Sequence, residues 1–142
     1  MQDRYKFRAI NMKTKEVFYI DNYYWFEENG VTEIDSNGTA SGNTGEYWID
    51  RCVGIKDVNN SLIFENDAIT DDISTHLINP RLLRVVFQNG CFGVINNGIY
   101  SFKPLIDFID YHTEKGKIIY DKCFMKVIGN SHENPELFYV AV

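Results

Sequence analysis

Apolar and polar residues alternate at the start of the chain, which is typical of a strand with one buried face. Over residues 5–10, Tyr5, Phe7 and Ala9 fall on one side of the predicted strand, and Lys6, Arg8 and Ile10 fall on the other. Residues 11–15 are polar and turn-like, and residues 16–20 return to β-favouring side chains. Together these segments predict an N-terminal β-hairpin.

A dense aromatic run follows the hairpin: Tyr23, Tyr24, Trp25 and Phe26. The favoured structural interpretation is a strand buried on both sides between two lobes. Four consecutive side chains cannot all point to one side of a strand, so the alternative interpretation is an exposed ring. Exposed aromatic side chains are enriched at interfaces and serve as stacking platforms. These four residues are therefore the candidate binding residues.

Residues 29–45 are rich in Asn, Gly, Ser and Thr and predict a loop at a boundary between lobes. We divide the single domain, residues 1–142, into an N-terminal lobe (1–49) and a second lobe with a C-terminal tail (50–142). In the second lobe, short strands are predicted at 52–55, 62–64 and 68–70, the first two separated by a turn at 57–61.

The strongest β pattern covers residues 82–102. Two Asn-Gly pairs, Asn89-Gly90 and Asn97-Gly98, separate three β-rich runs. Because Asn-Gly favours tight hairpin turns, the pattern predicts an antiparallel meander of three strands.

One helix is predicted after the meander. Pro104 suits a first helical position, and apolar or aromatic residues recur at helical spacing before the stop signal Gly116. The residues on the predicted face are Leu105, Phe108, Ile109 and His112. Strands are expected again at 118–120 and 123–128, followed by a turn at 133–136 and an apolar tail at 137–140.

Composition places the chain among globular proteins. With 142 residues, of which 44% are hydrophobic, it is long enough for one domain with its own core. No apolar run is long enough to cross a bilayer, and the first residues contain no apolar signal core. We expect a cytoplasmic protein that does not bind membranes.

The net charge of −6 is unevenly distributed. Residues 1–15 carry five basic side chains against Asp3: Arg4, Lys6, Arg8, Lys13 and Lys15. Residues 16–80 carry thirteen acids against Arg51 and Lys56. The acidic centre disfavours binding of a nucleic-acid phosphate backbone across the whole surface, but it does not exclude a local basic patch on the hairpin.

No catalytic or metal-binding pattern is apparent. His76, His112 and His132 are far apart in sequence and match no zinc-ligand spacing. The three cysteines, Cys52, Cys91 and Cys123, include no Cys-x-x-Cys pair, so we expect free, buried, structural thiols. We expect no catalytic residues, no metal and no cofactor.

Three stretches, in order along the chain, resemble the YopX-like family of bacteriophage and prophage proteins. The first is Tyr5-Lys6-Phe7-Arg8-Ala9 with Lys13-Thr14-Lys15-Glu16. The second joins residues 54–57, 59–60 and 63–69, and the third joins Val127-Ile128-Gly129-Asn130 to residues 133–137. Asn60 and Asn66 stand where the family usually has a turn glycine. Asn tolerates positive φ nearly as well as Gly, so both turns are expected to keep their shape.

The resemblance implies an α+β, mostly β fold, in which an N-terminal hairpin lobe precedes a small SH3-like β-barrel lobe over roughly residues 50–130. It also implies an origin in a mobile element, and it brings no established activity. The leading hypothesis is a non-enzymatic accessory protein that binds a protein partner or forms a homo-oligomer. The alternative is a nucleic-acid-associated small-barrel module that uses the basic hairpin and the aromatic residues.

Overall fold

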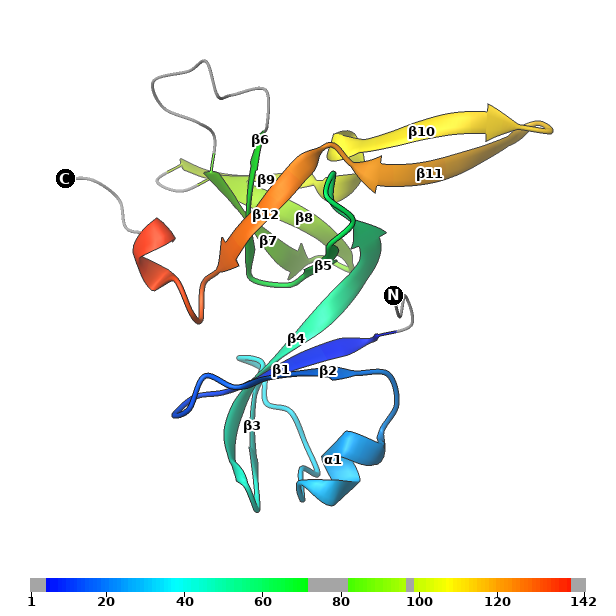
Figure 1. The fold of residues 1–142 in the computed structure, drawn as a ribbon. Coiled ribbons are helices and arrows are strands. Elements are labelled where there is room, and N and C mark those ends of the chain that lie inside the picture. The colour runs from blue at the N-terminus through cyan, green and yellow to red at the C-terminus, as the bar shows by residue number, and fades with distance from the viewer. Residues whose placement is uncertain (1–4, 72–81, 97–98, 139–142) are drawn as a thin grey trace. The chain divides into compact units, whose positions relative to one another are not determined.

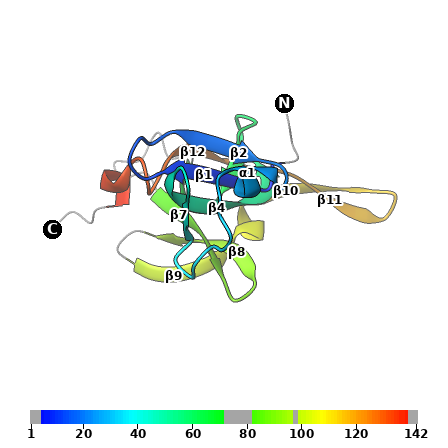
Figure 2. The same cartoon turned by 90° about the horizontal axis from the view of Figure 1, so that it is seen from below.

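The computed structural model describes residues 5–71, 82–96 and 99–138. The chain divides into two compact units, Met1–Gly54 and Ile55–Val142, which we call unit 1 and unit 2. Over the described residues, antiparallel strands predominate and one short α-helix is present (Figures 1 and 2). The predicted α+β, mostly β fold class is therefore confirmed. None of the described helices has the length and hydrophobicity that crossing a membrane requires.

The sheet of unit 1 has the strand order β2-β1-β4-β3. Its strands are β1 (Phe7–Asn11), β2 (Val17–Ile20), β3 (Thr39–Gly42) and β4 (Gly45–Lys56), of which β4 continues two residues into unit 2. The predicted hairpin is confirmed, because β1 and β2 pair antiparallel. Its turn is closed by Asn11, whose Oδ1 accepts hydrogen bonds from the N–H groups of Lys13 and Thr14 at 2.9 and 3.0 Å.

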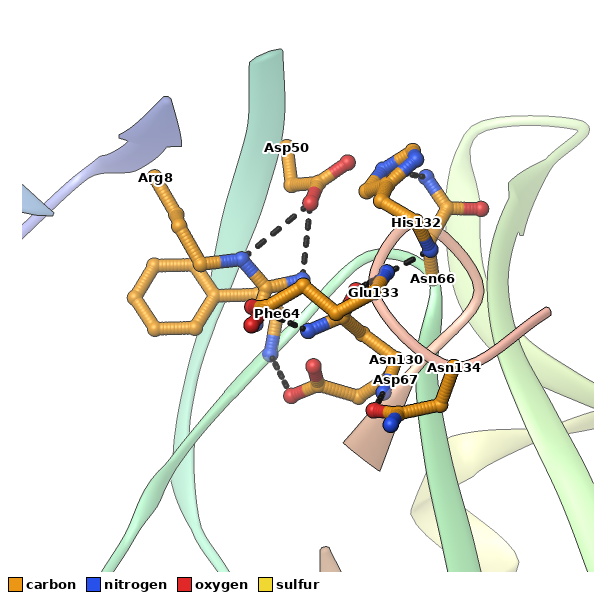
Figure 3. A network of polar contacts seen from close by, with 9 residues as sticks. All are labelled: Arg8, Asp50, Phe64, Asn66, Asp67, Asn130, His132, Glu133 and Asn134. Carbon is orange, nitrogen blue, oxygen red and sulfur yellow. Dashed lines mark hydrogen bonds and ion pairs between the residues drawn. The ribbon is translucent and has the colours of Figure 1, made fainter. Parts of the chain in front are cut away.

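Both faces of β1 are buried, where the alternation predicted one. Ala9 lies in the apolar core of unit 1, while Arg8 and Ile10 on the opposite face are also buried. Arg8 is directly opposite Asp50 in the pairing of β1 with β4. Its Nη2 and Nε donate to Asp50 Oδ2 at 2.7 and 3.1 Å (Figure 3). A buried guanidinium needs such a partner, and the partner comes from a strand 42 residues away.

The aromatic run forms helix α1 (Tyr24–Glu28), so the predicted strand is wrong. Before the helix, Asn22 Oδ1 accepts a hydrogen bond from the N–H of Tyr24 at 2.8 Å. After it, Gly30 adopts a positive φ of 68°. The segment 29–45, predicted to be a loop between lobes, contains β3 and lies within unit 1. Turn-forming residues at both ends therefore outweigh the β preference of the four rings.

Unit 2 has a five-stranded antiparallel sheet in the order β12-β6-β7-β8-β9. Its strands are β6 (Asp67–Asp71), β7 (Leu82–Gln88), β8 (Cys91–Asn96), β9 (Ile99–Pro104) and β12 (Met125–Asn130). The short strand β5 (Leu62–Phe64) precedes them and pairs with β4. β7, β8 and β9 form the predicted meander, with a turn at Asn89-Gly90. Asn97-Gly98 and the polar residues 72–81 lie outside the described residues. Closure into an SH3-like barrel stays a prediction.

The predicted helix after Pro104 is wrong. Leu105–Phe108 form a single 3-10 turn, η2, and Ile109–Glu114 form strand β10. Leu105 and Phe108, three residues apart, are buried as predicted, because one 3-10 turn brings them to the same side as a helix would. Ile109 is only partly buried at the start of β10. Lys115 and Gly116 both have positive φ and close a tight hairpin to β11 (Lys117–Cys123).

The hairpin β10–β11 forms a two-stranded sheet of its own and projects from unit 2 in both views (Figures 1 and 2). Most of its side chains are exposed. The predicted C-terminal turn is the 3-10 turn η3 (Pro135–Phe138).

The buried ring of Phe108 gives a test of how firmly η2 is anchored. Phe108 is 6% exposed, whereas Ile106 in the same turn is 50% exposed. We expect Phe108→Ala to lower the free energy of unfolding by about 3–5 kcal/mol. Ile106→Ala, the matched control, should lower it by less than about 0.5 kcal/mol. Urea denaturation followed by circular dichroism measures both, and equal losses would show that η2 is not anchored by its buried face.

Candidate functional site

An apolar pocket of about 260 Å³ lies in unit 1 beside helix α1. Aromatic rings and aliphatic side chains form most of its wall, and Glu33 adds a carboxylate. The lining residues are Phe7, Tyr23, Phe26, Val31, Thr32, Glu33 and Ile34. Because they come from β1, from α1 and its flank, and from the segment that follows the helix, the pocket exists only in the folded unit.

The turn that ends helix α1 places Val31 in the wall of this pocket. The N–H of Val31 donates to the carbonyl of Phe26 at 2.8 Å, and the N–H of Gly30 donates to that of Glu27 at 3.2 Å. With Gly30 at positive φ, this is the Schellman arrangement, which returns the chain toward the helix. It carries Val31 back to Phe26, and the next three residues, 32–34, also line the pocket.

The four candidate aromatic residues have different environments. Tyr23 and Phe26 line the pocket, the first 70% exposed and the second buried. Trp25 packs toward the core, edge-on to Tyr47 with 4.9 Å between ring centroids. Tyr24 is 67% exposed and is not part of the pocket wall. Two of the four rings, Tyr23 and Tyr24, are therefore exposed, and only two of the four residues, Tyr23 and Phe26, meet at the candidate site.

The second motif of the family-like pattern is explained by a buried carboxylate. Asp57 is buried, and its Oδ1 accepts hydrogen bonds from the N–H groups of Asn59 and Ser61 at 2.9 and 2.8 Å. Its Oδ2 accepts from the N–H of Val127 in β12 at 2.8 Å. Asn60 and Asn66 both have a φ of 69°, as expected where a turn glycine is replaced. This motif therefore shapes the fold of unit 2.

The third motif is organised by Asn130 at the end of β12 (Figure 3). Asn130 Oδ1 accepts from the N–H groups of His132 and Glu133 at 3.0 and 2.9 Å, and its Nδ2 donates to Glu133 Oε1 at 3.0 Å. Asn134 Oδ1 in turn accepts from the N–H of Asn130 at 3.3 Å. These bonds satisfy the backbone of a tight turn, which is a structural role.

The comparisons with known proteins agree with these motifs. A family model described as "YopX protein" matches residues 6–139. The chain belongs to the YopX protein family. The predicted resemblance is thereby confirmed over nearly the whole chain, and a search of the curated proteins finds no match.

A solved structure shares the fold of this YopX-family chain. It is the crystal structure of protein EF1440 from Enterococcus faecalis, which is 20% identical, with a TM-score of 0.54. The alignment covers 94% of this chain and 97% of the other. At this identity the likeness concerns the fold alone.

The basic block of this YopX-family chain is partly engaged within unit 1. Arg8 is buried against Asp50, as described above. Lys15 Nζ donates to the carbonyl of Met12 at 2.9 Å and lies 4.6 Å from the centroid of the Trp48 ring. Arg4 lies outside the described residues. The five basic side chains counted in the sequence therefore do not all contribute to one open surface.

The thiols and histidines also occupy different environments. Cys123 is buried and Cys52 is partly buried, but Cys91 is exposed beside the Asn89-Gly90 turn, which corrects the expectation of three buried thiols. Burial raises the pKa of the Cys123 thiol, and the nearby carboxylates of Asp57 and Asp110 raise it further. Among the described histidines, cysteines and carboxylates, no three lie close enough to hold a metal ion. His76 lies outside those residues.

Sequence reasoning missed Phe7, Val31 and Ile34 as pocket residues. The alternation at the start of the chain predicts a strand face for Phe7, and the other two lie in a segment predicted to be a loop. The sequence signal that could have identified Val31 and Ile34 is their spacing, because they are two apolar residues three apart in an otherwise polar stretch.

Thiol reactivity tests the exposure of Cys91. In the native protein we expect Cys91 to react with Ellman's reagent first and Cys123 last, because Cys123 is buried and its raised pKa leaves little thiolate. Cys91→Ser should remove the fast phase, whereas Cys123→Ser should leave it unchanged. Persistence of the fast phase in Cys91→Ser would contradict this assignment.

His112 on β10 provides a titration test. A hydrogen bond from Nδ1 to Asp121 Oδ2 at 2.9 Å and the charge of Asp121 raise the pKa of His112 above its ordinary value, and Glu114 adds a smaller effect. The interaction therefore stabilises the folded hairpin fully below the unfolded pKa of about 6.5, and the effect is lost as pH rises through the folded pKa. NMR titration of the imidazole should show a lower pKa in Asp121→Asn. Glu114→Gln should lower it less, and the reverse order would contradict the geometry.

Proposed function

We propose that this chain is a non-enzymatic phage or prophage accessory protein of the bacterial cytoplasm that acts by binding another protein through the pocket of unit 1. The observation that carries the proposal is an apolar pocket open at a rim that includes an exposed tyrosine, Tyr23. Membership of the YopX family is consistent with an accessory role.

The size and lining of the pocket favour a protein side chain over a metabolite. At about 260 Å³ it lies below the roughly 300–1,000 Å³ of typical small-molecule sites. Glu33 is the one charged residue of its wall, and no cationic side chain lines it. An aromatic or aliphatic side chain of a partner fits this chemistry, with Tyr23 covering it as an interface aromatic.

The alternative of a nucleic-acid-associated module has weaker support. Binding along a phosphate backbone needs free cationic side chains. Arg8, at the centre of the basic block, has its guanidinium committed to Asp50, and the pocket wall carries a carboxylate. Nuclease treatment during affinity capture distinguishes a nucleic-acid partner from a protein partner.

Two adjacent tyrosines offer a matched test of the pocket. In affinity capture from host lysate, we expect Tyr23→Ala to retain about tenfold less of a specific protein partner than the natural chain, the loss of one interface anchor. Tyr24→Ala should retain the partner, because Tyr24 is as exposed as Tyr23 but does not line the pocket. Quantitative mass spectrometry of the captured proteins measures both.

Nuclease treatment should leave the captured protein in place. Equal retention by Tyr23→Ala and Tyr24→Ala would show that the pocket is not the binding site. Release of the captured material by nuclease would instead favour the nucleic-acid module.

A further inference from the structure

The outer edge of strand β11 is not covered by any strand that the structure describes. β11 pairs with β10 and with no other described strand. Its residues 117–122 are all exposed, and the hairpin projects from unit 2 (Figures 1 and 2). An isolated two-stranded hairpin is marginally stable in water, and further strands are needed for independent stability. A strand added along this edge would therefore stabilise the hairpin.

The backbone groups of Ile118 and Tyr120 point toward this open edge. The hairpin closes through a two-residue turn, and the residues that flank such a turn exchange backbone hydrogen bonds. Bonded and non-bonded pairs then alternate along the antiparallel ladder. Lys117 flanks the turn, so Lys117 and Ile119 form the bonded pairs with β10. The N–H and C=O groups of Ile118 and Tyr120 are therefore directed away from β10 and available to another strand.

The two faces of β11 carry different side chains. Because side chains alternate along a strand, one face has charged ends around an apolar centre: Lys117, Ile119 and Asp121. His112 of β10 confirms this placement, since it is opposite Ile119 and its Nδ1 is hydrogen-bonded to Asp121 Oδ2 at 2.9 Å. The other face carries Ile118 and Tyr120, which are both exposed.

This pattern makes β11 complementary to itself when two copies lie side by side in antiparallel orientation. With a two-fold axis at Ile119, Lys117 of each copy is opposite Asp121 of the other. Ile118 is then opposite Tyr120, and the two Ile119 side chains meet at the axis. Directly opposite pairs of unlike charges, and of aromatic with β-branched residues, both stabilise antiparallel strands.

The neighbouring registers lack this complementarity. A two-fold axis perpendicular to the sheet passes through a residue, because opposite residues must share a face. An axis at Tyr120 would put Asp121 opposite Ile119, and an axis at Ile118 would put Lys117 opposite Ile119. Each arrangement places a charge against an apolar side chain. The sequence of β11 therefore favours its own copy as the added strand, and favours one register.

We propose that β11 of one copy of this chain pairs antiparallel with β11 of a second copy, with the two-fold axis at Ile119, to form a four-stranded sheet in the order β10-β11-β11-β10. Ile118 of each copy exchanges backbone hydrogen bonds with Tyr120 of the other. Such an interface is isologous and closes at a dimer. It does not use the pocket of unit 1, so the inference goes beyond the proposed function and does not depend on it.

The contact is small, so dimerisation is expected to be weak. Interfaces below about 1,200 Å² of total buried surface are typical of transient complexes. Analytical ultracentrifugation of the natural chain should show a monomer–dimer equilibrium at concentrations below about 1 mM. Tyr23→Ala in the pocket should leave this equilibrium unchanged. A natural chain that stays monomeric over this range would overturn the inference, and so would loss of the dimer in Tyr23→Ala.

A disulfide tests the position of the two-fold axis. Ile119 and its copy form a non-bonded pair, whose Cα atoms are about 4.5 Å apart, a separation that a disulfide can bridge. In a Cys91→Ser background, which removes the exposed native thiol, Ile119→Cys should cross-link two chains on mild oxidation. Ile118→Cys, the matched control, is opposite Tyr120 of the second copy and should cross-link far less. Equal cross-linking, read on a non-reducing gel, would contradict the register.

A charge exchange tests which side chains meet between the copies. Lys117→Glu would place two carboxylates opposite each other at both ends of the interface, and Asp121→Lys would place two ammonium groups there. Each variant alone should dimerise about tenfold more weakly than the natural chain. Lys122→Glu, the matched control, changes charge at a position opposite Gly116 of the second copy and should alter dimerisation by less than about twofold.

An equimolar mixture of Lys117→Glu and Asp121→Lys should recover dimerisation to within about twofold of the natural chain, because opposite charges then face each other at both ends. Damage to the hairpin within either variant would persist in the mixture, so recovery reports the contact between copies. Ultracentrifugation of each variant and of the mixture measures the effect. Failure of the mixture to recover dimerisation would overturn the proposed pairing.

Discussion

The arrangement of unit 2 depends most directly on the hydrogen bonds that the carboxylate of Asp57 accepts. It accepts hydrogen bonds from three backbone N–H groups, two in its own turn and one on a strand 70 residues away. A buried carboxylate is costly unless its oxygens are satisfied, so the turn and β12 must come together for either to be stable. The N–H of Val58 donates to the carbonyl of Met125 and adds a second link at the same place.

This dependence explains why the family motifs identify a fold without naming an activity. Asp57, Asn66 and Asn130 act on the backbone: the first accepts from N–H groups, the second adopts positive φ in a turn, and the third closes the turn after β12. These residues therefore serve to hold distant segments of the fold together. The pocket beside α1 uses other residues, so functional differences among proteins with this fold can arise without change to the motifs.

Much of the fold could be predicted from local patterns, because alternation and Asn-Gly turns act over a few residues. The hairpin β1–β2 and the β7–β8 turn are examples.

The errors occurred where two structures share a sequence pattern. Leu105 and Phe108 are three apart, which suits an α-helix and a 3-10 turn equally, and the aromatic run contains residues that favour strands. Burial of Arg8 could not be foreseen, because its partner Asp50 comes from another strand. The pocket likewise assembles from segments that are separate in sequence.

The isolation of the β10–β11 hairpin has a consequence for how the native chain exchanges with solvent. Its hydrogen bonds are local, and few of its side chains contribute to a core, so it can open while the meander β7–β8–β9 stays closed. Amide hydrogens of the hairpin then exchange through a low-energy opening, whereas amides that are hydrogen-bonded within the meander need a larger opening. The β10–β11 hairpin can therefore open at little cost in stability to the rest of the chain. A surface that binds the hairpin would selectively slow the exchange of its amide hydrogens.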